Sequence, residues 1–303
     1  MILKIGLNAS SRGLLLLGWL LTPLILFGQQ TLQAKFEAIE SNIKGNLGIN
    51  ALLIETGESI SLNGDKQFPM QSVYKFPIAM VMLKQVDEGK FSLEDTIQID
   101  KAEYIPKRGY SPIREKFPEG ARLTLKEIIR YNIESDGTAC DVLLKLLRGT
   151  AQVQRHIHNL GITNIAIATT EMVQVVNDSV QYQNWATPVA MSKLFQLFHE
   201  GTYLSKSSQA LLAEYMSVAA PWFDRRIKGL LPPNTKVIHK TGTSRTVEGF
   251  TGATNDAGII TLPDGRHLAL SVFISDSYDD QKKREETIAK VSKAAFDYWT
   301  SDK

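Results

Sequence analysis

The amino-acid sequence predicts an α+β fold, an α/β sandwich in which one antiparallel sheet is built from both ends of the chain. Segments with strand composition stand near both ends, and a long block with helical patterning separates them. Consecutive strands are joined by short turns, which is typical of antiparallel pairing. We therefore expect helices to cover the sheet and an all-helical domain to be inserted between its two halves.

Residues 1–28 are predicted to be a secretory signal peptide. Lys4 and Arg12 precede an apolar run that ends at Phe27, and the small residue Gly28 follows it. The apolar run, about 14 residues, is shorter than the roughly 20 that a membrane-spanning helix needs. We expect cleavage near Gly28, a periplasmic protein and no stable membrane association afterwards; an uncleaved membrane anchor is the alternative.

The mature chain is predicted to contain two domains, an α/β domain (29–67 and 218–303) and a helical domain (68–217). In the first, residues 48–55 and 59–62 flank the turn Thr56-Gly57-Glu58 and predict a hairpin. In the second, helices are expected at 76–89, from 123 onward and at 188–199. Residues 169–185 between them are polar and poorly periodic, so we expect a long loop, and such loops are usually functional.

The last block returns to strands and closes with a helix. Strands are expected at 236–240, 257–262 and 267–275, the last two paired across the turn Pro263-Asp264-Gly265-Arg266. Residues 279–300 are amphipathic. The apolar side of this predicted helix carries Ile288, Val291, Ala295, Phe296 and Trp299.

Composition excludes several classes of function. The chain has 303 residues, 43% of them hydrophobic, and a net charge of +2, which describes a globular protein with no electrostatic case for binding nucleic acid. Cys140 is the only cysteine, stands in an apolar helical pattern and is expected to be buried. His156 and His158 lack a cysteine or carboxylate cluster, so we expect exposed helix residues, no metal and no cofactor.

Ser72 and Lys75 are three residues apart at a predicted helix start, which places both side chains on one face. A neutral lysine there can take the serine proton. Alone the spacing is weak, since serine is common at helix N-termini.

Three further segments can complete such a site. They are Ser135-Asp136-Gly137, Glu171 in the predicted loop, and Lys240-Thr241-Gly242-Thr243-Ser244. Singly, each has a plainer interpretation as a helix cap, an exposed acid or a solvated strand charge. In this order, however, they resemble the motifs of class A serine β-lactamases and penicillin-binding proteins. The chain resembles class A from about residue 29 to 303, and residues 181–185 look like the extended-spectrum branch of PER and VEB type.

The resemblance implies a role for each motif residue. Ser72 would be the nucleophile, Lys75 its proton relay or base, and Ser135 the donor to the leaving lactam nitrogen. Glu171 would activate water against the acyl-enzyme; whether Lys75 or Glu171 is the acylation base stays open. Backbone N–H groups of Ser72 and Thr243 would form the oxyanion hole.

The substrate side of the implied site would bind a β-lactam. Lys240, Thr241 and Thr243 would hold the substrate carboxylate, with Gly242 and Ser244 on the same strand. Arg226 falls where the family often keeps a second cation, although Arg225 competes for that assignment. Tyr110 would line the cleft. Hydrolysis of penicillins and cephalosporins, and hence resistance, is the expected function.

The chain departs from the family pattern in three places. Gly137 replaces the asparagine of the second motif, and Val175 stands where an asparagine commonly helps to hold the water. Thr169 and Asn184 replace an arginine–aspartate clamp at the ends of the loop. We expect slower deacylation, a differently folded loop and broad cephalosporin acceptance.

Other interpretations stay open on the sequence alone. A D-Ala-D-Ala peptidase would share three motifs without needing Glu171, and a covalent β-lactam-binding protein would tolerate Gly137 and Val175. A metallo-hydrolase is disfavoured because the sequence has no His-rich ligand set. We expect a monomer, since no exposed apolar pattern indicates a dimer.

Overall fold

The computed structural model describes residues 31–218 and 224–301. The predicted signal peptide, 1–28, lies outside the described residues. Within the described ranges, no helix combines the length and apolar character needed to cross a membrane.

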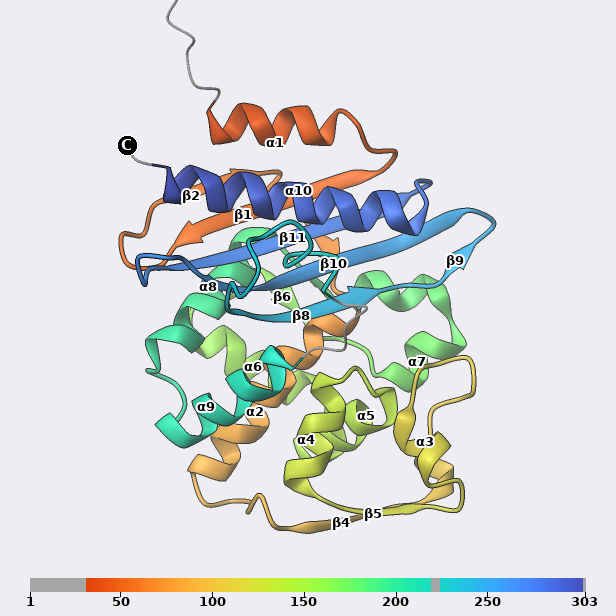
Figure 1. Ribbon diagram of the computed structural model, residues 1–303. Helices are drawn as coiled ribbons and strands as arrows, with labels where there is room; N and C mark the ends of the chain where they lie inside the picture. Colours follow the sequence, from red (N-terminus) through yellow and green to blue (C-terminus); the bar gives the residue numbers. More distant parts are fainter. Residues whose placement is uncertain (1–30, 219–223, 302–303) are drawn as a thin grey trace, which may run out of the picture. The chain divides into compact units, whose positions relative to one another are not determined.

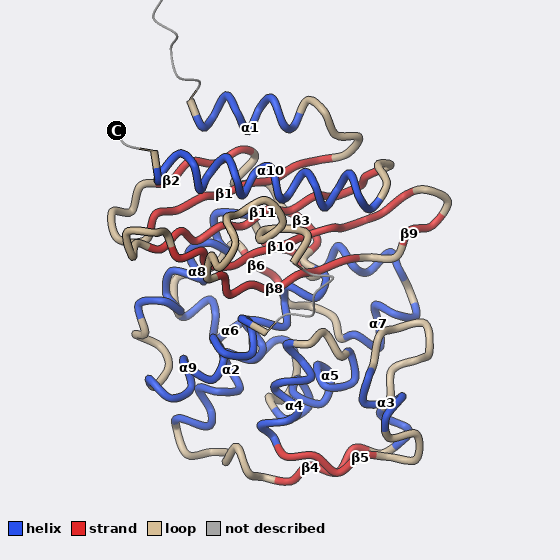
Figure 2. Tube along the Cα trace, in the orientation of Figure 1, coloured by secondary structure: helices blue, strands red, loops and turns tan. Residues whose placement is uncertain are grey.

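A six-stranded antiparallel sheet forms one half of the fold, in the order β2-β1-β11-β10-β8, with β9 paired to β10 (Figure 2). Two strands precede the helical block and four follow it, which confirms the predicted fold class. The strands are β1 (Asn46–Leu53), β2 (Ser59–Leu62), β8 (Val237–Thr243), β9 (Thr246–Val247), β10 (Phe250–Thr261) and β11 (His267–Ser277).

Strand β10 is longer than predicted. It begins at Phe250 rather than at residue 257, because its first half is polar and lacks the apolar alternation that predicts a strand. Thr251, Thr254, Asn255 and Asp256 are nevertheless all fully buried. Asn255 shows why these polar side chains are tolerated: its Nδ2 donates to Pro69 O (2.7 Å) and its Oδ1 accepts from the Ile274 N–H (3.2 Å).

Helices cover both faces of this sheet (Figure 1). On one face lie α1 (Leu32–Glu40) and α10 (Gln281–Thr300). The five predicted apolar residues of α10 are all buried, which confirms its amphipathic pattern. On the other face lies α8 (Pro188–Glu200), whose Ser192 Oγ donates to Asn50 O (3.1 Å) and lies 2.9 Å from Ser271 Oγ. The division into an α/β and a helical domain stays a prediction.

Helix α2 (Lys75–Asp87) is the centre of the helical part and packs against α4, α5, α6 and α9. Every residue from Lys75 to Leu83 is buried, because neighbours surround the helix on all sides. The remaining helices are α3 (Pro112–Lys116), α4 (Leu125–Ile133), α5 (Gly137–Leu146), α6 (Thr150–Asn159), α7 (Glu171–Val176) and α9 (Lys206–Ser217).

Short elements connect these helices. They are the 3₁₀ turns η1 (Gln71–Tyr74), η2 (Lys101–Glu103) and η3 (Asp178–Gln183), the hairpin of β4 (Thr96–Ile99) and β5 (Ala121–Thr124), and a small sheet of β3 (Phe68–Pro69), β7 (Trp185–Ala186) and β6 (Ile165–Ala166).

Three local predictions can be compared with this framework. Cys140 is fully buried, as predicted. His156 and His158 lie on α6 as expected but are half-buried rather than exposed, and a ring nitrogen of His158 is 2.9 Å from Ile165 O. The predicted loop 169–185 is largely ordered as α7, η3 and β7, because Thr170 and Asn177 within it and Asp141 on α5 cap its turns.

Candidate active site

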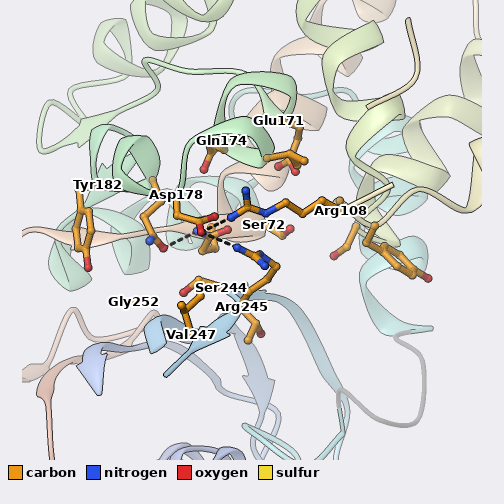
Figure 3. Close-up of a pocket in the computed structure, with 18 of the residues that line it drawn as sticks. Ser72, Arg108, Glu171, Gln174, Asp178, Tyr182, Ser244, Arg245, Val247 and Gly252 are labelled. Atoms are coloured by element: carbon orange, nitrogen blue, oxygen red, sulfur yellow. Dashed lines mark hydrogen bonds and ion pairs between the residues drawn. The ribbon is translucent and has the colours of Figure 1, made fainter. Parts of the chain in front are cut away.

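A cavity of about 610 Å³ opens between the strand β8 and the helical part (Figure 3). Most of the predicted site residues line it. They are Ser72, Tyr110, Ser135, Glu171, Thr241, Gly242, Thr243 and Ser244. Lys75 and Lys240 lie buried directly behind the lining and contact it through Ser72 and Ser135.

Ser72 lies in the 3₁₀ turn η1. Helix α2 follows this turn directly and begins at Lys75. The Lys75 Nζ is 3.1 Å from Ser72 Oγ, as the i, i+3 spacing predicted. The preceding residue, Gln71, has a φ of +46°, an unusual conformation for a side chain with a Cβ. Its amide donates to Gln181 Oε1 (2.8 Å), so the turn is tied to the 169–185 segment.

Lys75 is fully buried, and its ammonium group also contacts Glu171 Oε1 at very short range. Burial is the largest influence and disfavours the charged form, but the Glu171 carboxylate together with Cys140 and Asp141 outweighs burial and raises the pKa of Lys75 above its ordinary value. Lys75 is therefore a cation in the resting site, paired with a carboxylate.

A second hydroxyl–amine pair faces the first. Ser135 precedes α5 with a φ of +78°, and its Oγ accepts a hydrogen bond from Lys240 Nζ (2.6 Å). Burial and the nearby positive charge of Lys75 lower the pKa of Lys240 to about 7. Lys240 therefore changes charge near neutral pH when no anion is bound.

Glu171 is the first residue of α7, and two groups fix this helix end. Thr170 Oγ1 accepts from the Val173 N–H. Asp141 on α5 accepts from the N–H groups of Glu171 (2.7 Å) and Met172 (2.8 Å). Burial raises the pKa of Asp141 to about 6. Sequence reasoning missed Asp141; its place on α5 one helical turn after Gly137 was the available signal.

Strand β8 lies very close to the Ser72 turn at Gly242. A Cβ added to Gly242 would stand 2.4 Å from Met70 O and 3.1 Å from Ser72 N. Only glycine permits this approach without displacing backbone. The nucleophile's turn and the strand that carries Thr243 are therefore held against each other.

Arg226 lies behind β8 and not on the cavity surface. The residue is 2% exposed, its Nη2 donates to Thr243 Oγ1 (2.7 Å) and its Nη1 to Asn255 O (2.8 Å). Arg225 is exposed. The structure thus distinguishes the two arginines: Arg226 reaches the site through the Thr243 hydroxyl.

Gly137 leaves a space that another side chain fills. A Cβ on Gly137 would stand 2.4 Å from Ile105 Cδ1 and 3.1 Å from Glu171 Oε2. A Cβ on Gly109 would stand 2.6 Å from both Ile105 Cδ1 and Val175 Cγ2. Ile105, which is 1% exposed, therefore occupies the room beside Glu171. We call Ile105, Gly109, Gly137 and Val175 the apolar wall. Sequence reasoning missed Ile105.

The ends of the 169–185 segment are tied by an uncharged clamp. Asn184 Oδ1 accepts from the N–H groups of Ala168 (2.7 Å) and Thr169 (2.9 Å), and its Nδ2 donates to Thr169 O (2.9 Å). The positions that lack the arginine–aspartate pair are therefore still joined, through an amide side chain and backbone.

An ion-pair bridge crosses the mouth of the cavity (Figure 3). The Asp178 carboxylate contacts Arg108 at very short range and Arg245 at 2.6 Å. The three residues belong to three separate segments, so no local pattern could identify them.

This arrangement can perform nucleophilic acyl transfer followed by hydrolysis. It offers a serine hydroxyl beside a buried amine, a second hydroxyl that can donate a proton, and a carboxylate that can accept one from water.

Comparison with known proteins agrees with this chemistry. Residues 31–299 match the sequence profile described as "Beta-lactamase enzyme family". The chain is 38% identical to β-lactamase VEB-1 of Pseudomonas aeruginosa, over 95% of this chain and 97% of VEB-1. It is 36% identical to extended-spectrum β-lactamase PER-1 of the same organism, over 88% and 87%.

A solved structure extends the match to three dimensions. The crystal structure of a β-lactamase from Chitinophaga pinensis superimposes with a TM-score of 0.86 at 42% identity, covering 89% of this chain and 99% of that one. The peptidase alternative is not favoured. The chain belongs to the β-lactamase enzyme family and is a class A serine β-lactamase that hydrolyses the β-lactam ring.

Proposed function

We propose that the enzyme opens penicillins and cephalosporins through an acyl-Ser72 intermediate that Glu171 then clears. The observation that carries this proposal is the contact of one buried ammonium, Lys75 Nζ, with both Ser72 Oγ and Glu171 Oε1. It links the nucleophile and the hydrolytic carboxylate in a single chain of proton-transfer contacts.

Acylation begins when Ser72 Oγ attacks the lactam carbonyl carbon. Because Lys75 is a cation at rest, it can accept the serine proton only after passing one of its own to Glu171. We therefore assign Lys75 as the relay and Glu171 as the final acceptor. The N–H groups of Ser72 and Thr243 stabilise the oxyanion, and the close approach of β8 at Gly242 supports this assignment.

The lactam C–N bond then breaks, and the leaving nitrogen takes a proton from Ser135 Oγ. Lys240 Nζ donates a hydrogen bond to that oxygen at 2.6 Å and supports the transfer. The proton that Glu171 accepted returns through Lys75 to Ser135, so Glu171 is again a carboxylate before deacylation. Lys240, Thr241 and Thr243 hold the substrate carboxylate, while Arg226 orients the Thr243 hydroxyl from behind.

Deacylation needs a water and a base. Glu171 takes the proton of a water that attacks the acyl carbonyl, which releases Ser72. On one side this water meets the apolar wall and not the amide groups usual in the family. The position of the water therefore depends on Glu171. Asp141 fixes the backbone of Glu171 by accepting a hydrogen bond from its N–H.

We further propose a broad substrate range that includes oxyimino-cephalosporins. The similarity to PER-1, which is named an extended-spectrum β-lactamase, supports this, as does a cavity of about 610 Å³. Export through a signal peptide to the periplasm, and function there as a monomer without a cofactor, complete the proposal.

Ser72 and Glu171 are the two ends of the chain of proton-transfer contacts, and replacing them should have different effects. Ser72→Ala should lower turnover by about 10⁴- to 10⁶-fold with the fold intact, because the nucleophile is lost. Glu171→Gln should lower turnover by about 10²- to 10⁴-fold and trap the acyl-enzyme. Without the carboxylate, burial lowers the pKa of Lys75, which can then accept the serine proton itself.

The measurement is mass spectrometry of intact protein after exposure to a penicillin, together with turnover. Glu119→Gln, an exposed position, is the matched control and should behave as wild type. Unchanged turnover without an adduct in Glu171→Gln would remove Glu171 from its role, and wild-type turnover in Ser72→Ala would overturn the nucleophile.

Substrate capture should weaken as pH rises through about 7. The pKa of Lys240 in the free enzyme is about 7. Below that pH Lys240 is a cation that attracts the substrate carboxylate, and above that pH it loses this charge. We expect kcat/KM to fall on the alkaline side, mainly through KM. The kcat profile should fall only at higher pH, because a bound carboxylate raises the pKa of Lys240.

Lys240→Arg provides the control, because a guanidinium stays charged over this range. The kcat/KM of Lys240→Arg should be lower than that of the wild type, but it should stay constant over the pH range in which the wild-type value declines. A wild-type kcat/KM that stays constant from pH 6 to 9 would contradict the assignment.

Gly137→Asn should be destabilising in the wild type and tolerated once Ile105 is trimmed. Overpacking against Ile105 costs about 1–3 kcal/mol, and Ile105→Ala alone costs about 2–5 kcal/mol. The double variant should lose less stability than the two single variants lose in sum, and the difference should be about 0.5–3 kcal/mol. Urea denaturation of the four proteins measures this coupling; strictly additive losses would show that Ile105 does not fill the space.

A broad substrate range predicts comparable kcat/KM values for an oxyimino-cephalosporin and a simple penicillin. Negligible oxyimino-cephalosporin turnover would end this part of the proposal. Asp178→Asn should then favour the bulkier substrate by about 2- to 30-fold, since it removes two exposed ion pairs across the mouth, each worth about 0.2–1 kcal/mol. An unchanged ratio would mean that the bridge does not limit access.

A further inference from the structure

Two histidines and a glutamate from separate segments converge away from the active site. Glu55 lies in the turn after β1, His199 in the last turn of α8, and His267 at the start of β11. One ligand atom from each lies within 4.8 Å of the others. Within residues 31–218 and 224–301, this is the one group of three or more histidine, cysteine or acidic side chains with such convergence.

The three side chains are already positioned by the fold. The Glu55 carboxylate accepts from the His267 backbone N–H at 3.0 and 2.9 Å, and its Oε1 lies 2.8 Å from His267 Nδ1. The rings of His199 and His267 face each other with centroids 4.1 Å apart and an interplanar angle of 40°. All three groups are at least partly accessible to solvent, so an ion can reach them.

We propose that Glu55, His199 and His267 form a zinc-binding site that is separate from the catalytic centre. Two imidazole nitrogens and one carboxylate oxygen suit Zn²⁺, with water as the fourth ligand. Mg²⁺ and Ca²⁺ prefer oxygen-only ligand sets and are excluded by the same chemistry.

The resting protonation states agree with this ligand set. Burial and the neighbouring His267 lower the pKa of His199, which favours the neutral imidazole that binds metal. Burial alone would raise the pKa of Glu55, but hydrogen bonds from His267 lower it, so the carboxylate is an anion at neutral pH.

The site would join the helical layer to the sheet. His199 is on a helix that covers one face of the sheet, His267 begins the strand β11, and Glu55 lies in the turn that follows β1. His267 pairs with Thr261, nine residues along β10 from Gly252 at the cavity, a distance of roughly 30 Å at about 3.4 Å per residue. Zinc bound there would stabilise the fold without touching the reacting atoms.

Isothermal titration of EDTA-treated, dialysed protein with ZnSO₄ tests the proposal. We expect one Zn²⁺ per chain and a saturable rise in Tm over the same concentrations. His199→Ala and His267→Ala should each weaken binding at least tenfold and abolish the Tm rise. Titration with Co²⁺ should give visible absorption bands in the wild type that both variants lose.

His156→Ala is the matched control, because His156 lies on α6 outside the cluster and should leave zinc binding unchanged. Hydrolysis of a chromogenic cephalosporin reports that each variant is folded, and its rate should not respond to zinc. Wild-type protein that binds no Zn²⁺, or Zn²⁺ binding that survives unchanged in His199→Ala and His267→Ala, would overturn the site.

Discussion

The arrangement of this enzyme depends on keeping one charged amine in a place that water does not reach. Lys75 is fully buried on the central helix, where an isolated ammonium would be strongly unfavourable. The Glu171 carboxylate compensates the charge and raises the pKa of Lys75. Losing Glu171 would leave the buried amine without its counter-charge, and breaking a buried pair in this way costs about 3–5 kcal/mol in proteins. Structural stability and catalytic readiness therefore come from the same pair.

Much of the surrounding structure serves to hold Glu171 at that point. Asp141 caps the short helix that begins at Glu171, and Asn184 ties the ends of the segment that contains it. Gln71 connects the same segment to the nucleophile's turn. The missing arginine–aspartate clamp is thus replaced by neutral hydrogen bonds, which do not depend on ionic strength as an exposed ion pair does.

The unusual residues Gly137 and Val175 belong to the same packing arrangement. Gly137 and Val175 look like two independent losses of a polar side chain when they are read in the sequence. In the fold, Gly137 adjoins Ile105, which fills the space next to Glu171, and Ile105 and Val175 both adjoin Gly109. One side of the hydrolytic site is therefore apolar because Ile105 packs there, and the bulk of this isoleucine requires a glycine, Gly137, opposite it.

The sequence by itself determined the features that follow from local periodicity and motif spacing. These include the sheet built from both ends, the amphipathic last helix, and the common face of Ser72 and Lys75. Tertiary structure decided the contacts between distant segments: Ile105 against Gly137, Asp141 under Glu171, Asp178 between two arginines, and Arg226 rather than Arg225 behind Thr243. The physical reason is that periodicity encodes which face of an element is buried, whereas the partner it meets there depends on how separate elements pack.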